Sequence, residues 1–238
     1  MQTNITKAVL LAAGRGTRMR NLTEELPKPM LQLRGKPMLQ HIVEGLHDAG
    51  LTDFLVIVGW RAEVVRDFFE DGSALGVHIE YETQAVPDGT GKVLELARPF
   101  TGNDPFLLSY GDILVAPENY PRICDTLADA EAVVSVKRSE DVSHGGAVFV
   151  NDRFELIDLR EKPKPSEPTS PLCNAGIYAF RPSIFEYVAR LQRSPRGEFE
   201  LTDALRNMAL DGHKLQVLEL VGDWADVRDP EILAHLNR

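Results

Sequence analysis

The chain has 238 residues, of which 43% are hydrophobic and 26% are charged, and its formal net charge is −10. A chain of this length and apolar content can bury a full core, which excludes a disordered protein. The acidic balance argues against a nucleic acid or an acidic membrane as partner, because such partners are bound by basic patches. Since no apolar run resembles a spanning helix or a secretory signal, we expect a cytoplasmic protein.

The first half of the chain alternates between strand-like and helix-like segments. Strands are predicted at 7–11, 54–58, 77–81 and 106–110. The first intervening helix places Met38, Leu39, Ile42, Val43 and Leu46 at helical spacing, with Pro37 near its start and Gly50 as its C-cap. Further helices are predicted at 61–70, burying Val64, Val65 and Phe68, and at 90–98, burying Val93, Leu94 and Ala97. Such alternation is typical of βαβ units and a mostly parallel sheet.

The second half has more strands and fewer intervening helices. Strands are predicted at 133–137, 147–150, 154–159, 176–180 and 215–220, and helices at 182–192, 200–211 and 229–236. Asn151 and Asp152 indicate a hairpin turn, and the proline-rich stretch 162–171 is interpreted as a loop over the site. Cys124 and Cys173 lack metal-ligand spacing, so we expect two reduced, mostly buried thiols.

A glycine-rich loop, Leu11 to Met19, leaves the carboxyl end of the first strand, which is the edge where open α/β sheets bind ligands. Gly14 and Gly16 would let backbone N–H groups approach an anion closely. The planar guanidinium of Arg18 can grip two phosphate oxygens, and Lys28 adds a compact second charge. The loop therefore predicts phosphate binding.

Two common phosphate motifs do not fit this loop. The dinucleotide fingerprint needs a third small residue where the chain has Met19, and an acidic residue about 20 positions further on is missing. The Walker sequence G-x-x-x-x-G-K-[ST] occurs nowhere in the chain. Hydride transfer and P-loop chemistry are therefore disfavoured.

Gly14-x-Gly16-Thr17-Arg18, followed by Pro27-Lys28-Pro29 and Gly35-Lys36-Pro37-Met38, resembles the signature of the sugar-1-phosphate nucleotidyltransferases. Further segments match that family in order, from residue 7 to about 236. The resemblance implies a Rossmann-like three-layer α/β fold with a mixed, mostly parallel central sheet and a small sugar-binding β subregion. It implies a single domain over 1–238, with a nucleotide-binding half at about 1–115 and a sugar-binding half at about 116–238.

The resemblance also implies residue roles. Arg18, Lys28 and Asp112 would be catalytic, and Asp112 and Asp226 would hold Mg²⁺; Asp112 ends the strand 106–110 in Gly-Asp, and Asp226 lies in Trp224-Ala225-Asp226. The nucleotide-binding residues would be Leu11, Ala13, Gly14, Gly16, Thr17, Gln84 and Gly89. The sugar-phosphate-binding residues would be Gly145, Glu161, Lys162 and Asn174. His144 is expected to be incidental.

A member of this family would join a nucleoside triphosphate to a sugar 1-phosphate, giving a nucleotide sugar and pyrophosphate. The resemblance to short members and the Gln84 match favour UTP or dTTP, and the chain should be monofunctional, with no appended β-helix. The alternatives are a cytidylyl- or guanylyltransferase acting on phosphocholine, a heptose phosphate or a mannose phosphate, and a catalytically silent nucleotide-binding subunit. A homo-oligomer is compatible with each of them.

Overall fold

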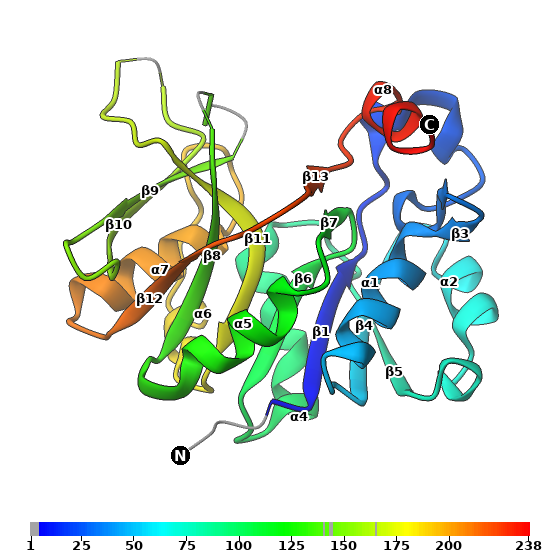
Figure 1. Cartoon of the computed structure of the whole chain (residues 1–238), viewed down its shortest axis with the longest axis horizontal. Helices are drawn as coiled ribbons and strands as arrows, with labels where there is room; N and C mark the ends of the chain where they lie inside the picture. The colour runs from blue at the N-terminus through cyan, green and yellow to red at the C-terminus, as the bar shows by residue number, and fades with distance from the viewer. Residues whose placement is uncertain (1–4, 140, 143–144, 165) are drawn as a thin grey trace.

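The computed structural model describes residues 5–139, 141–142, 145–164 and 166–238. Its centre is a mixed nine-stranded sheet in which β10, β9, β11, β6, β1, β4 and β5 lie in that order, with β8 joining β11 to β12 (Figure 1). The strands of the first half are β1 (Lys7–Ala12), β4 (Asp53–Val58), β5 (His78–Thr83) and β6 (Phe106–Tyr110). All four are parallel, so their carboxyl ends meet at one edge.

The second half extends the same sheet with strands of both directions. These are β8 (Ala132–Arg138), β9 (Gly146–Val150), β10 (Leu156–Glu161), β11 (Leu172–Phe180) and β12 (Leu215–Glu219). Strand β11 runs antiparallel to β6, β8 and β9, and the β9–β10 hairpin turns at the predicted position. One sheet therefore runs through both predicted halves, while the division near residue 115 stays a prediction.

Helices cover both faces of the sheet because successive strand residues point to opposite sides. In β1, Ala8 and Leu10 belong to one hydrophobic cluster and Val9 to the other. The first cluster packs under α1 (Met38–Asp48), α2 (Ala62–Phe69) and α5 (Asn119–Thr126), and the second under α3 (Thr90–Val93), η4 (Leu94–Ala97), α6 (Ile184–Val188) and α7 (Leu201–Leu210). The predicted three-layer α/β fold is confirmed.

Several short elements complete the chain. A two-stranded ribbon is formed by β7 (Ile113–Val115) and β13 (Trp224–Asp226), and a second one by β2 (Gln32–Leu33) and β3 (Lys36–Pro37). The remaining elements are η1 (Thr17–Thr23), η2 (Lys28–Met30), η3 (Ser73–Leu75), α4 (Arg98–Thr101), η5 (Leu127–Asp129) and α8 (Pro230–Leu236). Figure 1 shows α8, which lies at the C-terminal end of the sequence, beside the segment that follows β1, and α8 contacts η1 there.

Some local predictions need correction. In α2, Val65 and Phe69 are buried, whereas Phe68 is 49% exposed, because the inward stripe repeats every four residues from Val65. The predicted helix 90–98 is a succession of three short turns, α3, η4 and α4, although Val93, Leu94 and Ala97 are buried as predicted. The β7–β13 ribbon and α5 were not predicted.

The two cysteines, Cys124 and Cys173, are free and buried, as predicted. Across the described ranges, every helix is too short or too polar to cross a membrane.

Candidate functional site

The site begins where β1 and β6 end side by side. The backbone N–H of Gly111 donates to the carbonyl of Leu11 at 2.9 Å. A Cβ on Gly111 would stand 3.1 Å from the same oxygen, so glycine permits this close approach. The glycine-rich loop and Asp112 therefore leave the sheet together, as the strand pattern predicts.

Gly16 shapes the glycine-rich loop. Its φ is +70°, and a Cβ there would lie 2.7 Å from the Cβ of Lys28. The residue therefore serves both a left-handed turn and a close contact with the Lys28 side chain. By contrast, the space around Gly14 is open to 4 Å. Thr17 and Arg18 are exposed, while Met19 is fully buried and anchors the loop.

Lys28 and Asp112 form an ion pair. The Nζ of Lys28 lies 2.5 Å from Oδ2 of Asp112, and Lys28 as a whole is only 9% exposed. A buried ammonium group needs a charged or hydrogen-bonding partner. The structure thus joins two of the three predicted catalytic residues directly.

Asp226 approaches from the β7–β13 ribbon. Within it Asp226 pairs with Ile113, and the N–H of Val227 donates to the carbonyl of Asp112 at 3.0 Å. Burial and then the neighbouring Asp112 carboxylate raise the pKa of Asp226, while Lys28, Arg228 and Arg18 act in the opposite direction. Two carboxylates from segments over a hundred residues apart therefore share one electrostatic environment.

This pair fits a divalent cation. Carboxylate oxygens are hard donors, and Mg²⁺ is commonly held by one or two carboxylates together with substrate phosphates and water. Among the described residues, no group of three or more His, Cys, Asp or Glu side chains could form a complete metal cage. A metal held by this pair would therefore take its remaining ligands from elsewhere, such as substrate phosphates and water.

A cleft of about 350 Å³ lies over this edge of the sheet. Its lining includes seven predicted residues, namely Leu11, Ala13, Gly14, Lys28, Gln84, Gly89 and Asp112. Thr90, Tyr110 and Glu198 also line it and were not predicted. A Cβ on Gly89 would lie 2.4 Å from the carbonyl oxygen of Phe199, so this glycine is required by packing against the second half of the chain.

The predicted sugar residues gather around Glu161. The N–H of Lys162 donates to the carbonyl of Gly145 at 2.7 Å, and Lys162 Nζ lies 3.9 Å from Glu161. Burial and the neighbouring Glu200 raise the pKa of Glu161, whereas Lys162 and Arg196 lower it. The amide of Asn174 donates to the Tyr178 hydroxyl at 2.6 Å.

Sequence reasoning missed the buried polar groups behind these residues. Arg196 lies 3.5 Å from Glu161 and 3.2 Å from Glu200, which is 4% exposed. The Thr202 hydroxyl is buried and lacks a hydrogen-bond partner within the part of the chain that the structure describes. The burial of Glu200 could not be predicted from the sequence, because a glutamate just before an amphipathic helix is usually exposed. His144 lies outside the described residues.

Two tyrosines link the two sides. Burial raises the pKa of Tyr110 to about 12 and that of Tyr178 well above its usual value. Their rings meet edge to face with centroids 6.0 Å apart. Tyr110 lines the cleft and the Tyr178 hydroxyl accepts from Asn174, so two neutral phenols lie between the cleft and the residues around Glu161.

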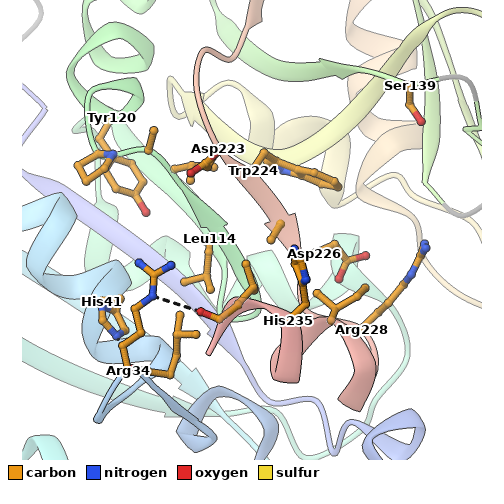
Figure 2. A pocket seen from close by; sticks show the side chains of 17 residues that line it. Arg34, His41, Leu114, Tyr120, Ser139, Asp223, Trp224, Asp226, Arg228 and His235 are labelled. Carbon is orange, nitrogen blue, oxygen red and sulfur yellow. Dashed lines mark hydrogen bonds between the residues drawn. The ribbon is translucent and has the colours of Figure 1, made fainter. Parts of the chain in front are cut away.

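A larger cavity of about 890 Å³ is lined by residues of both strands of the β7–β13 ribbon (Figure 2). Figure 2 shows Arg34 and His41 on one side of it and Asp226 and Arg228 on the other. Of the predicted site residues only Asp226 lines it. Its lining contains no residue of the glycine-rich loop and not Lys28, so the smaller cleft, which holds seven of the predicted residues, is the candidate site, and Asp226 approaches it from the ribbon beside Asp112.

A comparison with models of protein families shows to which family the chain belongs. The family model described as nucleotidyl transferase matches residues 7–238. The chain belongs to this family. Members of the nucleotidyl transferase family generally depend on a divalent metal, in agreement with the donor set described above.

The family includes clear relatives of this chain. The "Bifunctional protein GlmU" of Methanococcus maripaludis is 37% identical over 94% of this chain and 51% of its own length. The "UTP--glucose-1-phosphate uridylyltransferase AglF" of Haloferax volcanii is 33% identical over 94% of this chain and 92% of its own length. The chain thus spans about half the length of the GlmU relatives that it matches.

Solved structures agree with the fold. A Bacillus anthracis protein assigned as a glucose-1-phosphate thymidylyltransferase, crystallised with a sucrose, has a TM-score of 0.87 at 30% identity, covering 97% of this chain and 93% of its own. A UDP-glucose pyrophosphorylase complexed with UDP-glucose has a TM-score of 0.89 at 24% identity, covering 98% and 97% respectively, and supports the fold alone.

Proposed function

We propose that the chain transfers a nucleoside monophosphate from UTP or dTTP to a sugar 1-phosphate, giving a nucleotide sugar and pyrophosphate. The observation that carries this proposal is the meeting of Asp112, Asp226 and Lys28 at the end of β6, beside the glycine-rich loop. Family membership and the name of the uridylyltransferase relative support it.

The reaction needs charge neutralisation more than proton transfer. The sugar phosphate has a second pKa of about 6, so it is already anionic near neutral pH and requires no protein base. Attack of its oxygen on the α-phosphorus breaks the bond to the β-phosphate and releases pyrophosphate. Arg18 and Lys28 would stabilise the negative charge that accumulates on this leaving group.

Backbone groups would hold the triphosphate. Gly14, Gly16 and Thr17 would cradle it, with Leu11 and Ala13 lining the same cleft. Asp112 and Asp226 would hold Mg²⁺, which when bound would neutralise phosphate charge and orient the α-phosphate. Lys28 rests on Asp112 in this structure, so a phosphate would compete with Asp112 for its ammonium group.

The remaining residues would select the two substrates. Gln84 can donate to and accept from a base edge, and Gly89 lets the backbone approach the base. Glu161 and Asn174 would bind sugar hydroxyls, Gly145 would contact the sugar through its backbone, and Lys162 would pair with the sugar phosphate. We add Arg196 to this list because it lies against both Glu161 and Glu200.

The test is pyrophosphate release from each of UTP, dTTP, CTP, GTP and ATP, mixed with Mg²⁺ and a panel of sugar 1-phosphates. We expect release with UTP or dTTP and at least one sugar 1-phosphate. Activity confined to CTP or GTP would favour the cytidylyl- or guanylyltransferase alternative. Binding of a nucleotide without turnover on any acceptor would favour the silent regulatory subunit.

A further inference from the structure

Trp60 lies in the turn after β4 and contacts the glycine-rich loop near its start, at Ala13, and η1, into which the loop continues, at its last residue, Thr23. Its backbone N–H donates to the carbonyl of Ala13 at 3.3 Å, and its indole Nε1–H donates to the carbonyl of Thr23, also at 3.3 Å. These two carbonyls are ten residues apart in the chain. A single residue is therefore hydrogen-bonded to the chain on both sides of Gly14, Arg15 and Gly16.

The middle of the loop also rests on Trp60. The guanidinium carbon of Arg15 stands 4.3 Å from the centroid of the indole ring, and that of Arg61 stands 5.7 Å from it. Such stacking fixes the direction of a long cationic side chain. Arg15 is exposed and lies between Gly14 and Gly16, at the centre of the segment expected to meet phosphate.

The surrounding residues are built for this contact. A Cβ on Gly59 would lie 2.6 Å from the Ala13 carbonyl oxygen, so a side chain there would push the turn away from the loop. On the far end, the hydroxyl of Thr23 donates back to the carbonyl of Gly16 at 3.0 Å, and Thr23 is only 2% exposed. The carbonyl that Trp60 binds therefore belongs to a residue already tied to the turn of the loop.

Trp60 is not a core residue. It is only partly buried and belongs to none of the hydrophobic clusters formed by the described residues. Its hydrogen bonds go to Ala13 and Thr23, and its ring lies against Arg15 and Arg61. The contacts of Trp60 with the glycine-rich loop therefore explain its presence better than a contribution to the hydrophobic core does.

We propose that Trp60 is a positioning residue that holds the glycine-rich loop, and Arg15 within it, in the conformation that receives the triphosphate of the nucleotide. The identity of that ligand rests on the proposed function. Trp60 itself would not touch the substrate. Its two hydrogen bonds and its ring fix the loop before binding, so that less conformational freedom is lost when phosphate arrives.

Steady-state kinetics of Trp60→Leu and Trp60→Phe test this role. In Trp60→Leu we expect KM for the nucleoside triphosphate to rise about tenfold, the effect of losing one hydrogen bond and one exposed cation–π contact, with KM for the sugar 1-phosphate unchanged. Trp60→Phe keeps a ring under Arg15 and should lie between Trp60→Leu and the wild type. Phe68→Leu, which removes an exposed aromatic ring from the neighbouring α2, is the matched control and should behave as wild type.

Coupling to Arg15 separates positioning from a general structural role. If Arg15 acts through its seat on Trp60, the effects of Arg15→Met and Trp60→Leu on KM for the nucleotide will be less than additive in the double variant. Additive effects, or a wild-type KM in Trp60→Leu, would overturn the proposal. If Trp60→Leu fails to fold, the same criteria apply to Trp60→Phe.

A readout without turnover keeps the inference distinct from the proposed function. Trypsin can cleave after Arg15 or Arg18 in the loop, or after Arg20 just beyond it, and all three residues are exposed. We expect cleavage in this segment to be several-fold faster in Trp60→Leu than in the wild type or in Phe68→Leu. Equal cleavage rates would refute the positioning role, whereas absence of pyrophosphate release from the wild type would refute only the proposed function.

Discussion

The residues that we propose for the nucleotide and those that we propose for the sugar would solve different binding problems. On the nucleotide side, the glycine-rich loop offers backbone groups and exposed side chains such as Thr17 and Arg18. On the sugar side, Glu161 carries a raised pKa because it is partly buried and lies beside Glu200, which is itself 4% exposed. The first set of residues includes an exposed cation, Arg18, and the second includes a buried carboxylate, that of Glu200.

The proposed ligands explain this difference. A triphosphate is strongly charged and can be attracted by accessible cations and backbone N–H groups. A sugar is a neutral polyol, so its recognition requires acceptors that are already oriented and shielded from water. The indole N–H of Trp224, next to Asp226 in sequence, donates to the carbonyl of Ala175 at 3.0 Å and ties the two sides together.

The largest effect is expected from Asp112→Asn on the nucleotide side. Loss of the negative charge would remove one carboxylate from the proposed metal site and the partner of Lys28, and we predict that pyrophosphate release falls about a thousandfold. Asp223→Asn is the matched control, because Asp223 is an exposed carboxylate three residues from Asp226. Near-normal turnover in Asp112→Asn, with an unchanged circular dichroism spectrum, would remove Asp112 from the mechanism.

On the sugar side, Lys162→Ala should act on one substrate only. We predict that KM for the sugar 1-phosphate rises about ten- to a hundredfold, the range for loss of a charged hydrogen bond, with little change in KM for the nucleotide. Lys164→Ala controls for charge in the same loop, since Lys164 is exposed. Should Lys162→Ala impair the nucleotide instead, the assignment of the two sides would be wrong.

The sequence was most informative where the chemistry is local. Gly14, Gly16 and Lys28 could be placed because a strand followed by glycines and cations predicts both the geometry and the ligand class. The alternation of apolar segments likewise predicted the four parallel strands to within about two residues at each end. Asp112 followed from its position directly after a buried strand.

The sequence was least informative where distant segments meet. Arg196 and Glu200 reach Glu161 from nearly forty residues away, and nothing in their own segment marks them as buried. The β7–β13 ribbon is three residues long on each strand, too short for an alternation pattern, although it carries Asp226. Phe68 and Phe69 exchanged roles because adjacent aromatic residues leave the helix face ambiguous.

Substitutions at Gly14 and Gly16 would separate a structural role from a binding role on the nucleotide side. Gly16→Ala should lower the free energy of unfolding by about 1–3 kcal/mol, because the new Cβ would meet Lys28 and the left-handed φ is strained. Gly14→Ala meets open space and should leave thermal stability unchanged. If the backbone of Gly14 binds phosphate, Gly14→Ala should nevertheless raise KM for the nucleotide. A KM equal to that of the wild type would show that the phosphate does not contact Gly14.

The smallest effect concerns pH on the sugar side. Because the folded-state pKa of Glu161 is raised, the carboxylate takes up a proton at a higher pH than an ordinary glutamate does. KM for the sugar 1-phosphate should therefore begin to rise as the pH falls through this raised value. Protonation of the substrate phosphate affects both proteins alike, so Glu161→Gln should show a smaller rise than the wild type, from a KM about tenfold above that of the wild type at neutral pH.

The raised pKa of Glu161 also affects stability: the ionised carboxylate, which favours binding of the sugar phosphate, disfavours the folded state. An acid whose pKa is raised by folding destabilises the folded state above that pKa, where it must be ionised, and this cost disappears below the unfolded value. Glu161→Gln should therefore raise the melting temperature at neutral pH and lose this advantage in acid. A variant that binds sugar phosphate more weakly yet melts higher would show that the buried carboxylate is retained for recognition at the expense of stability; a lower melting temperature at neutral pH would assign Glu161 a structural role instead.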